Sequence, residues 1–521
     1  MRKEKILQSV DLRIPLTTDP SEFLCPLRLA FERMRTAVSK HPYPSWEERY
    51  VRLEQLEQLV VTHRAEIAEA ICSDFGHRSA LQTDMLDVLP LLTHIRNLRE
   101  NIRDWMKVQK GSADMAFLPA KTALLPQPKG IVGVISPWNY PLLLSLGPAA
   151  TAIAAGNICM IKVSETTPGF ASLLAELVSK YFVPEDLTVI TGDAETGKRF
   201  CALPFDHLVF TGSPAVARKV MESAARNLTP LTLELGGKSP ALIAPGYSLE
   251  HAAERIMYAK LLNAGQTCIA PDYVLVEKRH LARLVNLLQK AGRKFYPKGI
   301  NDEEYTSIVS IKHFENLLHT LDDASRTALF EPVFKGDQID IEKRKIAPHI
   351  VIEPSLTGEL MKNEIFAPIL PVISYPDDRM DQAVEFINAR PHPLALYLFD
   401  NDQESVRKVM RETKSGGVTV NDTLWHAAQS NLPFGGIGNS GMGTWTGKVG
   451  FDAMSHHKPV FYQSKLSPIS MLNPPYTEKF KAFLESQISA GSLAKTKEGL
   501  QLLRQKTAGF FAGLRGKDDM L

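Results

Sequence analysis

The sequence predicts an α/β protein with two doubly wound domains, in each of which helices cover both faces of a largely parallel sheet. A chain of 521 residues, 44% hydrophobic and 23% charged, is long enough for at least two hydrophobic cores. From Gly130 onward, short apolar runs alternate with helical segments, and a similar alternation resumes after Pro240. Such alternation is typical of parallel sheets whose crossover connections are helices.

The segment from Phe23 to about Lys110 has a helical pattern. Apolar residues such as Leu53, Leu56 and Val60 recur at steps of three and four among charged residues. This spacing places them on one face of a helix, so we expect a layer of packed helices before the first sheet.

The first α/β unit is predicted after Gly130. Its apolar runs predict buried strands at 131–135, 158–161, 187–190 and 207–210, and the segments between them predict helices at 143–155 and 168–180. A sheet of this kind binds its ligand at the carboxyl ends of its strands. Residues that directly follow these strands are therefore candidates for a site.

The second α/β unit is predicted after Pro240. We expect helices at 249–262 and 280–290 and strands at 273–276, 350–352 and 369–373. The stretch 297–338 is rich in charge and lacks strong strand signals.

Residues 476–515 could form one or two amphipathic helices that pack on the body or on a partner subunit. A membrane-surface role for this tail is the less favoured alternative, because its apolar run at 510–514 is short.

The charge and cysteine content exclude several classes of protein. Sixty Lys and Arg residues balance 58 Asp and Glu residues, so nothing favours nucleic acid as a partner. The basic start lacks a following apolar region, and no run is long enough for a membrane helix, so we expect a soluble, cytoplasmic protein without a membrane span. The cysteines form no CxxC pair and indicate neither disulfides nor a metal site. They are Cys25, Cys72, Cys159, Cys201 and Cys268.

The residues Cys268 and Glu234 suggest covalent catalysis. A thiolate can attack a carbonyl carbon, and a carboxylate can take a proton from the thiol or from water. By itself this pair also describes a thiol hydrolase. Asn139 follows the first predicted strand, where its amide could stabilise an oxyanion together with the backbone N–H of Cys268. From residue type alone, a helix cap is the favoured role for Asn139.

Two further segments follow predicted strands and suit a dinucleotide. Lys162 and Glu165 lie three residues apart, where they could hold ribose hydroxyls, although such residues beside a helix start are also common on surfaces. Gly212 and Ser213 precede a predicted helix, whose N-terminus is a favourable seat for phosphates.

Six motifs occur in the order used by the aldehyde dehydrogenase superfamily, and the chain resembles that superfamily from about Phe23 to Gln463. Residues 266–273 and 440–443 resemble its class 3 branch, and the segment 74–79 with the long tail resembles coniferyl-aldehyde dehydrogenases. The six motifs are Pro137-Trp-Asn-Tyr-Pro141, Phe210-Thr-Gly-Ser213, Leu233-Glu-Leu-Gly-Gly-Lys238, Gly265-Gln-Thr-Cys268, Asn363-Glu-Ile-Phe-Ala-Pro368 and Pro433-Phe-Gly-Gly-Ile-Gly-Asn-Ser-Gly441.

The resemblance implies a role for each matching residue. Cys268 would be the nucleophile, Asn139 would belong to the oxyanion hole, and Glu234 would activate the water that hydrolyses a thioester. The implied cofactor-binding residues are Lys162 and Glu165 at the adenosine ribose, Gly212 and Ser213 at the pyrophosphate, Glu364 at the nicotinamide ribose, and Phe366 and Trp138 near the nicotinamide.

The resemblance also implies an architecture. We expect a Rossmann-like NAD(P)-binding domain at 1–110 and 129–234 and a catalytic domain at 235–435. A β-hairpin oligomerisation arm with a bridging segment is expected at 111–128 and 436–463, followed by a tail at 464–521. Class 3 relatives imply a homodimer.

Two positions depart from the family pattern. Val163 replaces a common Pro in the loop of Lys162 and Glu165, and Ala217 replaces a frequent second Gly after Gly212. Neither change removes a chemical group, so we expect cofactor binding to persist. A carboxylate at position 165 would repel a 2′-phosphate, which favours NAD, with NADP as the alternative.

Three other signals are interpreted structurally. Gly436–Gly441 matches G-x-G-x-x-G, but we expect no strand before it and no helix after it. His456 and His457 would point to opposite faces of a strand, which does not favour a metal. We expect Cys159 and Cys72 to be buried packing residues.

The leading hypothesis is an NAD(P)-dependent dehydrogenase of a small-molecule aldehyde. The resemblance suggests an aromatic substrate such as coniferyl aldehyde, with medium-chain aliphatic aldehydes as the alternative. Two other functions stay open. One is acyl transfer to coenzyme A, against which Glu234 argues, and the other is a binding protein that keeps the fold without turnover.

Overall fold

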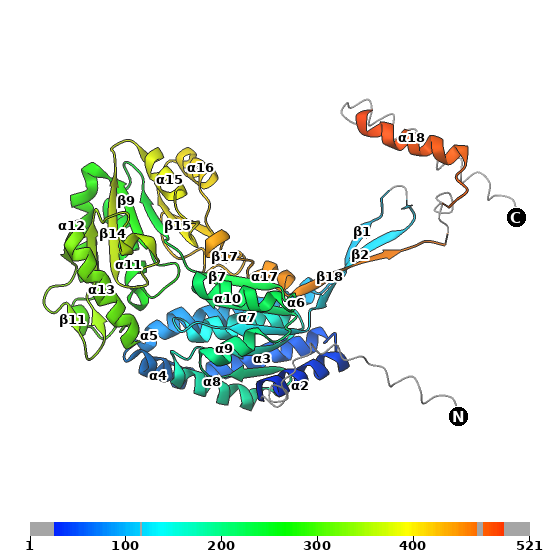
Figure 1. Ribbon diagram of the computed structural model, residues 1–521, viewed down its shortest axis with the longest axis horizontal. Coiled ribbons are helices and arrows are strands. Elements are labelled where there is room, and N and C mark those ends of the chain that lie inside the picture. Colours follow the sequence, from blue (N-terminus) through cyan, green and yellow to red (C-terminus); the bar gives the residue numbers. More distant parts are fainter. Residues whose placement is uncertain (1–25, 115–116, 466–472, 494–521) are drawn as a thin grey trace. The chain divides into compact units, whose positions relative to one another are not determined.

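The computed structural model describes residues 26–114, 117–465 and 473–493, and it divides the chain into two compact units (Figure 1). The larger unit comprises the described residues up to Lys107 together with Pro126–His457. The smaller unit comprises the described residues of Val108–Leu125 and of the segment from Lys458 onward. Among the described residues, no helix is both long enough and apolar enough to cross a membrane.

The N-terminal helical layer is confirmed. Ser45 starts α3 through a capping box with Glu48, and Leu53, Leu56 and Val60 are fully buried on one face of that helix. The helices are α2 (Pro26–Lys40), α3 (Trp46–Thr62), α4 (Arg64–Phe75), α5 (Ala80–Thr83) and α6 (Leu89–Trp105), and a short π-helical turn (Asp84–Val88) precedes α6.

A six-stranded sheet forms the first α/β layer, in the order β17-β7-β6-β3-β4-β5. All its pairings are parallel except that of β17 with β7. The four strands predicted in this unit are confirmed, whereas β7 and β17 were not predicted. The strands are β3 (Ile131–Ile135), β4 (Ile158–Lys162), β5 (Leu187–Ile190), β6 (His207–Gly212), β7 (Leu231–Leu235) and β17 (Gly441–Met442).

Helices cover both faces of this sheet, as predicted for a doubly wound fold. One apolar core joins the sheet to α3, α4, α6, α7 (Pro141–Ala154) and α8 (Pro168–Tyr181). The other core joins it to α2, α9 (Ala194–Cys201) and α10 (Pro214–Ala225). The polar residues that follow the strands are thereby left at the carboxyl edge of the sheet.

A seven-stranded sheet forms the second α/β layer, in the order β10-β13-β14-β9-β8-β15-β16. Helices α11 (Leu249–Leu261), α12 (Leu281–Phe295) and α13 (Ile311–Thr327) pack on one face, and α15 (Met380–Asn388) and α16 (Gln403–Glu412) on the other. The strands are β8 (Pro240–Ile243), β9 (Tyr273–Glu277), β10 (Leu329–Pro332), β13 (His349–Ile352), β14 (Ile369–Tyr375), β15 (Ala395–Phe399) and β16 (Gly417–Val420).

The stretch 297–338 does contain a strand, which its weak sequence signal did not indicate. β10 is short and lies at the sheet edge, antiparallel to β13, and Leu329 is 61% exposed. An edge strand buries little apolar surface, so its sequence need not show the continuous apolar run of a central strand.

The smaller unit contains a β-hairpin where a hairpin arm was expected. β1 (Gln109–Ser112) pairs antiparallel with β2 (Lys121–Pro128), and β18 (Ser455–Tyr462) completes the sheet order β1-β2-β18. Phe117 and Phe461 pack edge to face, with ring centroids 6.0 Å apart. The tail contains one described helix, α18 (Glu478–Leu493), within the region predicted to be helical, and residues 494–515 lie outside the described residues.

Candidate active site

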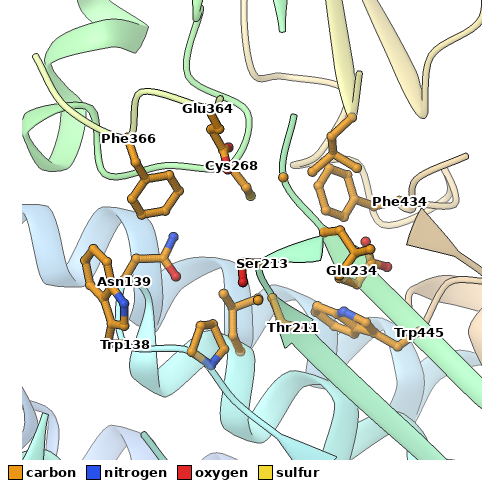
Figure 2. Close-up of a pocket in the computed structure, with 16 residues that line it drawn as sticks. Trp138, Asn139, Thr211, Ser213, Glu234, Cys268, Glu364, Phe366, Phe434 and Trp445 are labelled. Carbon is orange, nitrogen blue, oxygen red and sulfur yellow. The ribbon is translucent and has the colours of Figure 1, made fainter. Parts of the chain in front are cut away.

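A cavity of about 260 Å³ in the larger unit brings together eight of the ten predicted site residues (Figure 2). It lies where the carboxyl ends of β3, β6 and β7 meet the segment before β9. The eight residues are Trp138, Asn139, Gly212, Ser213, Glu234, Cys268, Glu364 and Phe366, and the cavity is also lined by Pro137, Leu144, Thr211, Leu235, Gly236, Leu394, Phe434 and Trp445.

The loop that carries Cys268 is shaped by three consecutive left-handed residues. Asn263, Ala264 and Gly265 have φ values of 51°, 52° and 76°. A Cβ on Gly265 would lie 2.3 Å from the carbonyl oxygen of Ala367, so only glycine fits there. The backbone thus turns sharply just before Cys268 and packs against the loop of Phe366.

Gln266 fixes this loop from inside the protein. Its side-chain nitrogen donates to the carbonyl oxygens of Asn263 (2.9 Å) and Ser307 (3.0 Å), and its side-chain oxygen accepts from the Val309 backbone N–H (3.0 Å). Because Gln266 is fully buried, these bonds hold the segment before Cys268 in one position.

The Cys268 side chain faces the cavity and is half-buried. Burial raises its pKa above the ordinary value of a thiol, and the carboxyl groups of Glu364 and Glu234 raise the pKa further. At neutral pH the resting group is therefore a thiol, and attack on a carbonyl requires that a base remove its proton.

Asn139 lies between β3 and α7 and is 4% exposed. Its side-chain nitrogen donates to the carbonyl oxygen of Gln266 at 3.2 Å, and the N-cap position of α7 belongs to Tyr140. The structure therefore directs the Asn139 amide toward the Cys268 loop, and the helix-cap alternative is wrong.

A buried ion pair supports the Asn139 backbone, and sequence reasoning missed it. Arg78 and Asp87 are both fully buried and lie 2.7 Å apart. Arg78 also donates to the Asn139 carbonyl oxygen at 3.0 Å, and Asp87 accepts from the Leu143 backbone N–H at 3.0 Å. The pair thus ties α4–α6 to the start of α7, and nothing in the local sequence distinguishes these charges from surface residues.

Glu234 lies on β7, opposite Thr211 of β6 and Gly441 of β17. It is 3% exposed, and neither carboxyl oxygen has a hydrogen-bond partner among the described residues. Burial raises its pKa well above the ordinary value, because no neighbouring cation or donor offsets the lost hydration. A carboxyl group with a raised pKa is suited to accept a proton near neutral pH.

The loop of Glu364 and Phe366 is fastened by a largely buried ion pair. Lys238 Nζ lies 2.5 Å from Asp272 Oδ2 and also donates to the Leu360 and Asn363 carbonyl oxygens at 2.8 and 3.1 Å. Asp272 Oδ1 accepts from the Ile365 backbone N–H at 3.1 Å. The residues on both sides of Glu364 are therefore held by the same pair.

This loop places Glu364 and Phe366 at the cavity. The Glu364 carboxyl group packs on Gly236, where a Cβ would lie 1.9 Å from Oε2, and burial raises its pKa to about 8. The Phe366 ring packs edge to face on Trp138, with centroids 5.4 Å apart. Glu364 Oε1 is buried and has no partner within the described residues, which leaves an acceptor for a ligand hydroxyl.

Lys162 and Glu165 lie outside the residues that line this cavity. Lys162 is buried at the end of β4 and donates to the Val163 carbonyl oxygen at 2.6 Å and to Glu165 at 3.4 Å, whereas the Glu165 side chain is 52% exposed. Since only β3 separates β4 from β6, both residues share the carboxyl edge of the sheet with Gly212 and Ser213. Ser213 caps α10.

These residues fit a dinucleotide. Glu165 presents an accessible carboxylate for ribose hydroxyls, α10 offers its N-terminus to phosphates, and Glu364 keeps a buried acceptor without a partner among the residues described. Ala217, the departure from the glycine pattern, is 2% exposed and packs into the core beneath α10.

The G-x-G-x-x-G match is a false dinucleotide fingerprint, as predicted. It contains a short 3-10 turn (Gly438–Ser440) followed by β17, and no strand–turn–helix unit surrounds it.

His456 and His457 both belong to β18, and His457 lies 3.1 Å from Asp452. Cys159 is buried as predicted, whereas Cys72 is only half-buried because it lies at the edge of the packed face of α4.

The fold and the cavity agree with the comparisons to known proteins. The model of the aldehyde dehydrogenase family matches residues 27–460, and the chain belongs to this family of oxidoreductases. A probable coniferyl aldehyde dehydrogenase of Caulobacter vibrioides is 43% identical over 466 residues, which cover 88% of this chain and 96% of that protein.

Two further similarities support membership of the aldehyde dehydrogenase family. Aldehyde dehydrogenase family 3 member A2 of Macaca fascicularis is 37% identical and covers 80% of this chain, with 84% of that protein matched. A solved structure of Staphylococcus aureus AldH in a substrate-bound state has a TM-score of 0.83 at 34% identity, with 88% of this chain and 99% of that chain covered. The predicted resemblance to class 3 and to coniferyl-aldehyde dehydrogenases is confirmed.

Proposed function

We propose that the protein oxidises an aromatic aldehyde to its carboxylic acid with NAD, through a thioester on Cys268. The observation that carries the proposal is that Cys268, Asn139 and Glu234 line one cavity together with Glu364 and Phe366. A hydrolase would need the first three residues alone. Glu364 and Phe366, on the loop that Lys238 fastens, give the cavity a second region that suits a cofactor.

The reaction begins with the Cys268 thiol. As the sulfur bonds to the aldehyde carbon, its proton passes to a base, and the carbonyl oxygen becomes an oxyanion. Asn139 Nδ2 would donate to that oxygen instead of to Gln266, together with the Cys268 backbone N–H. When bound, NAD supplies the acceptor for the hydride that leaves the substrate carbon. The acyl group then remains on Cys268.

Glu234 acts in the release of the acid. Its carboxylate takes a proton from a water molecule, whose oxygen attacks the thioester carbon and displaces the Cys268 sulfur. The raised pKa of Glu234 makes its ionised carboxylate a stronger base for this proton transfer. Water is thus the favoured acceptor, which argues against transfer to coenzyme A.

The six-stranded sheet carries the residues that would hold the cofactor. Glu165 would accept from the hydroxyls of the adenosine ribose, and the α10 N-terminus with Gly212 and Ser213 would face the pyrophosphate. Glu364 would accept from the other ribose, with Phe366 and Trp138 beside the nicotinamide. A carboxylate at position 165 repels a 2′-phosphate, so we propose NAD in preference to NADP.

Coniferyl aldehyde is the substrate that we propose, because the Caulobacter relative carries that name and the cavity has aromatic walls from Phe434 and Trp445. The test compares kcat/KM for coniferyl aldehyde and hexanal, with NAD and with NADP, by the absorbance of the reduced cofactor. We expect the highest value with coniferyl aldehyde and NAD, and ferulic acid as product. Absence of turnover across both aldehydes, or a coenzyme A thioester as product, would contradict the proposal.

We also propose a homodimer that assembles through the hairpin of β1 and β2. The motivation is that this hairpin lies where the family resemblance implies an oligomerisation arm. Light scattering at working concentration should give about twice the chain mass of 57.9 kDa. A monomeric mass would refute this part.

A further inference from the structure

Trp445 brings an indole N–H group to the cavity, and the mechanism proposed above assigns no role to that group. The residue is 4% exposed and lines the cavity. Its ring packs edge to face on His94, with centroids 5.2 Å apart, and a Cβ on Gly147 would lie 2.7 Å from a ring carbon. The indole Nε1–H is buried and has no hydrogen-bond partner among the described residues. A buried donor of this kind points to a missing acceptor.

Within the described part of the chain, both carboxyl oxygens of Glu234 lack a hydrogen-bond partner, and Glu234 lies on the sheet face whose core contains Trp445. Parallel pairing sets Thr232 opposite Val209, and successive side chains of a strand alternate between faces. Thr232 and Glu234 therefore share the face of Val209, whose core also contains Trp445. The alternate residue, Leu233, belongs to the core on the opposite face.

The backbone also brings the two residues together. β17 pairs with β7 so that Gly441 lies opposite Glu234, and Trp445 follows β17 after two residues. Gly443 lies against Thr232, so the chain stays close to β7 before it reaches Trp445. Figure 2 shows Glu234 and Trp445 on the same side of the cavity.

We propose that Trp445 is a positioning residue for Glu234, whose carboxylate accepts a hydrogen bond from the indole Nε1–H through one water molecule. This inference rests on the proposed role of Glu234 in thioester hydrolysis. An N–H donor stabilises the ionised carboxylate and opposes the effect of burial. The indole keeps its proton at neutral pH, so Trp445 orients the base and takes no part in proton transfer.

Among the described residues, four titratable groups bear on the Glu234 titration. Cys268 and Glu364 face it across the cavity. Burial lowers the pKa of His94, beneath Trp445, to about 4 and that of His207, which bonds Thr232, to about 3. Both histidines are thus neutral above about pH 5. A change in the Glu234 titration can then be traced to Trp445.

The direct test is the Trp445→Phe variant, which removes the donor and keeps an aromatic ring. Difference infrared spectroscopy over a pH series reports ionisation of the Glu234 carboxyl group, with the band identified by its loss in Glu234→Gln. We expect the midpoint to rise by about one to two pH units, the size of a hydrogen bond to a charged group. An unchanged midpoint would overturn the inference, whatever happens to the affinity for the aldehyde.

Kinetics provide an independent readout and a matched control. In Trp445→Phe, the rising limb of the pH profile for acid release should move upward by the same one to two units. Phe434→Leu changes an apolar side chain of the same cavity and removes no hydrogen-bond donor. This variant should therefore leave the pH profile for acid release unshifted. Equal shifts in both variants would show a packing effect only. If the parent enzyme forms no NADH, the proposed function itself fails, whereas the infrared result still decides the inference.

Discussion

Lys238 and Asp272 form a largely buried ion pair, 2.5 Å from Nζ to Oδ2, that fastens both ends of the Asn363–Ile365 segment. Lys238 follows the β7 strand of Glu234, and Asp272 follows Cys268 by four residues. The pair therefore couples the loop of Glu364 to the segments that carry Glu234 and Cys268, two residues for which we propose catalytic roles.

Asp272→Asn should weaken cofactor use more than aldehyde use. The change removes the charge that holds Lys238, so the Glu364 loop loosens and kcat/KM for NAD should fall about tenfold or more. The free energy of unfolding should fall by about 3 kcal/mol, because a buried cation loses its partner. Arg52→Met, which breaks a distant pair with Asp186, is the control and should lower stability alone. Equal effects on the two substrates would refute the positioning role.

Glu234→Gln should separate the two halves of the reaction. The amide keeps the shape of the side chain but cannot take a proton from water, so steady-state acid release should fall by about 10² to 10⁴. One equivalent of NADH should still form rapidly in a stopped-flow experiment. A variant that retained the parent steady-state rate would show that another group activates the water.

Asn139→Ala should slow the first half of the reaction. Loss of one donor to the oxyanion costs about 10² to 10³ in rate, so the rapid formation of NADH should slow by that factor. Since the side chain also bonds the Gln266 carbonyl oxygen, the melting temperature of the variant must be measured alongside. An unchanged NADH burst in a folded variant would remove Asn139 from the oxyanion hole.

The pH dependence of alkylation reports the state of Cys268. Its pKa is raised by burial and then by Glu364 and Glu234, so the thiolate fraction and the rate with iodoacetamide should climb throughout the range from pH 7 to 9. Glu364 has a pKa of about 8, so Glu364→Gln should accelerate alkylation mainly above that pH, where the lost charge would otherwise be present. Peptide mass spectrometry measures the rate. A rate that is flat over this range would mean a low thiol pKa.

The central strands could be predicted from the sequence because each is buried on both faces. β3, β4 and β6 read as continuous apolar runs, and their carboxyl ends correctly indicated where Asn139 and Gly212 would meet. The edge strand β10 could not be predicted, since its side chains are partly exposed and carry no such run.

The supporting contacts of the site depend on residues far apart in the sequence. Lys238 and Asp272 are 34 positions apart, and Lys238 reaches Asn363 over 125 positions. The burial of Trp445 likewise results from packing on α6 and α7, and its position in the chain gives no sign of a cavity. Motifs could indicate the candidate reacting groups, but only the folded chain shows which contacts hold those groups in place.

The Cys268→Ala variant tests the central claim most directly. NADH formation from coniferyl aldehyde should be measured for the parent, for this variant and for Cys72→Ala, whose thiol lies on α4 outside the cavity lining. The covalent mechanism predicts that Cys268→Ala loses at least about a thousandfold in rate while Cys72→Ala keeps the parent rate. A Cys268→Ala protein that reduces NAD with the aldehyde at the parent rate would contradict the mechanism.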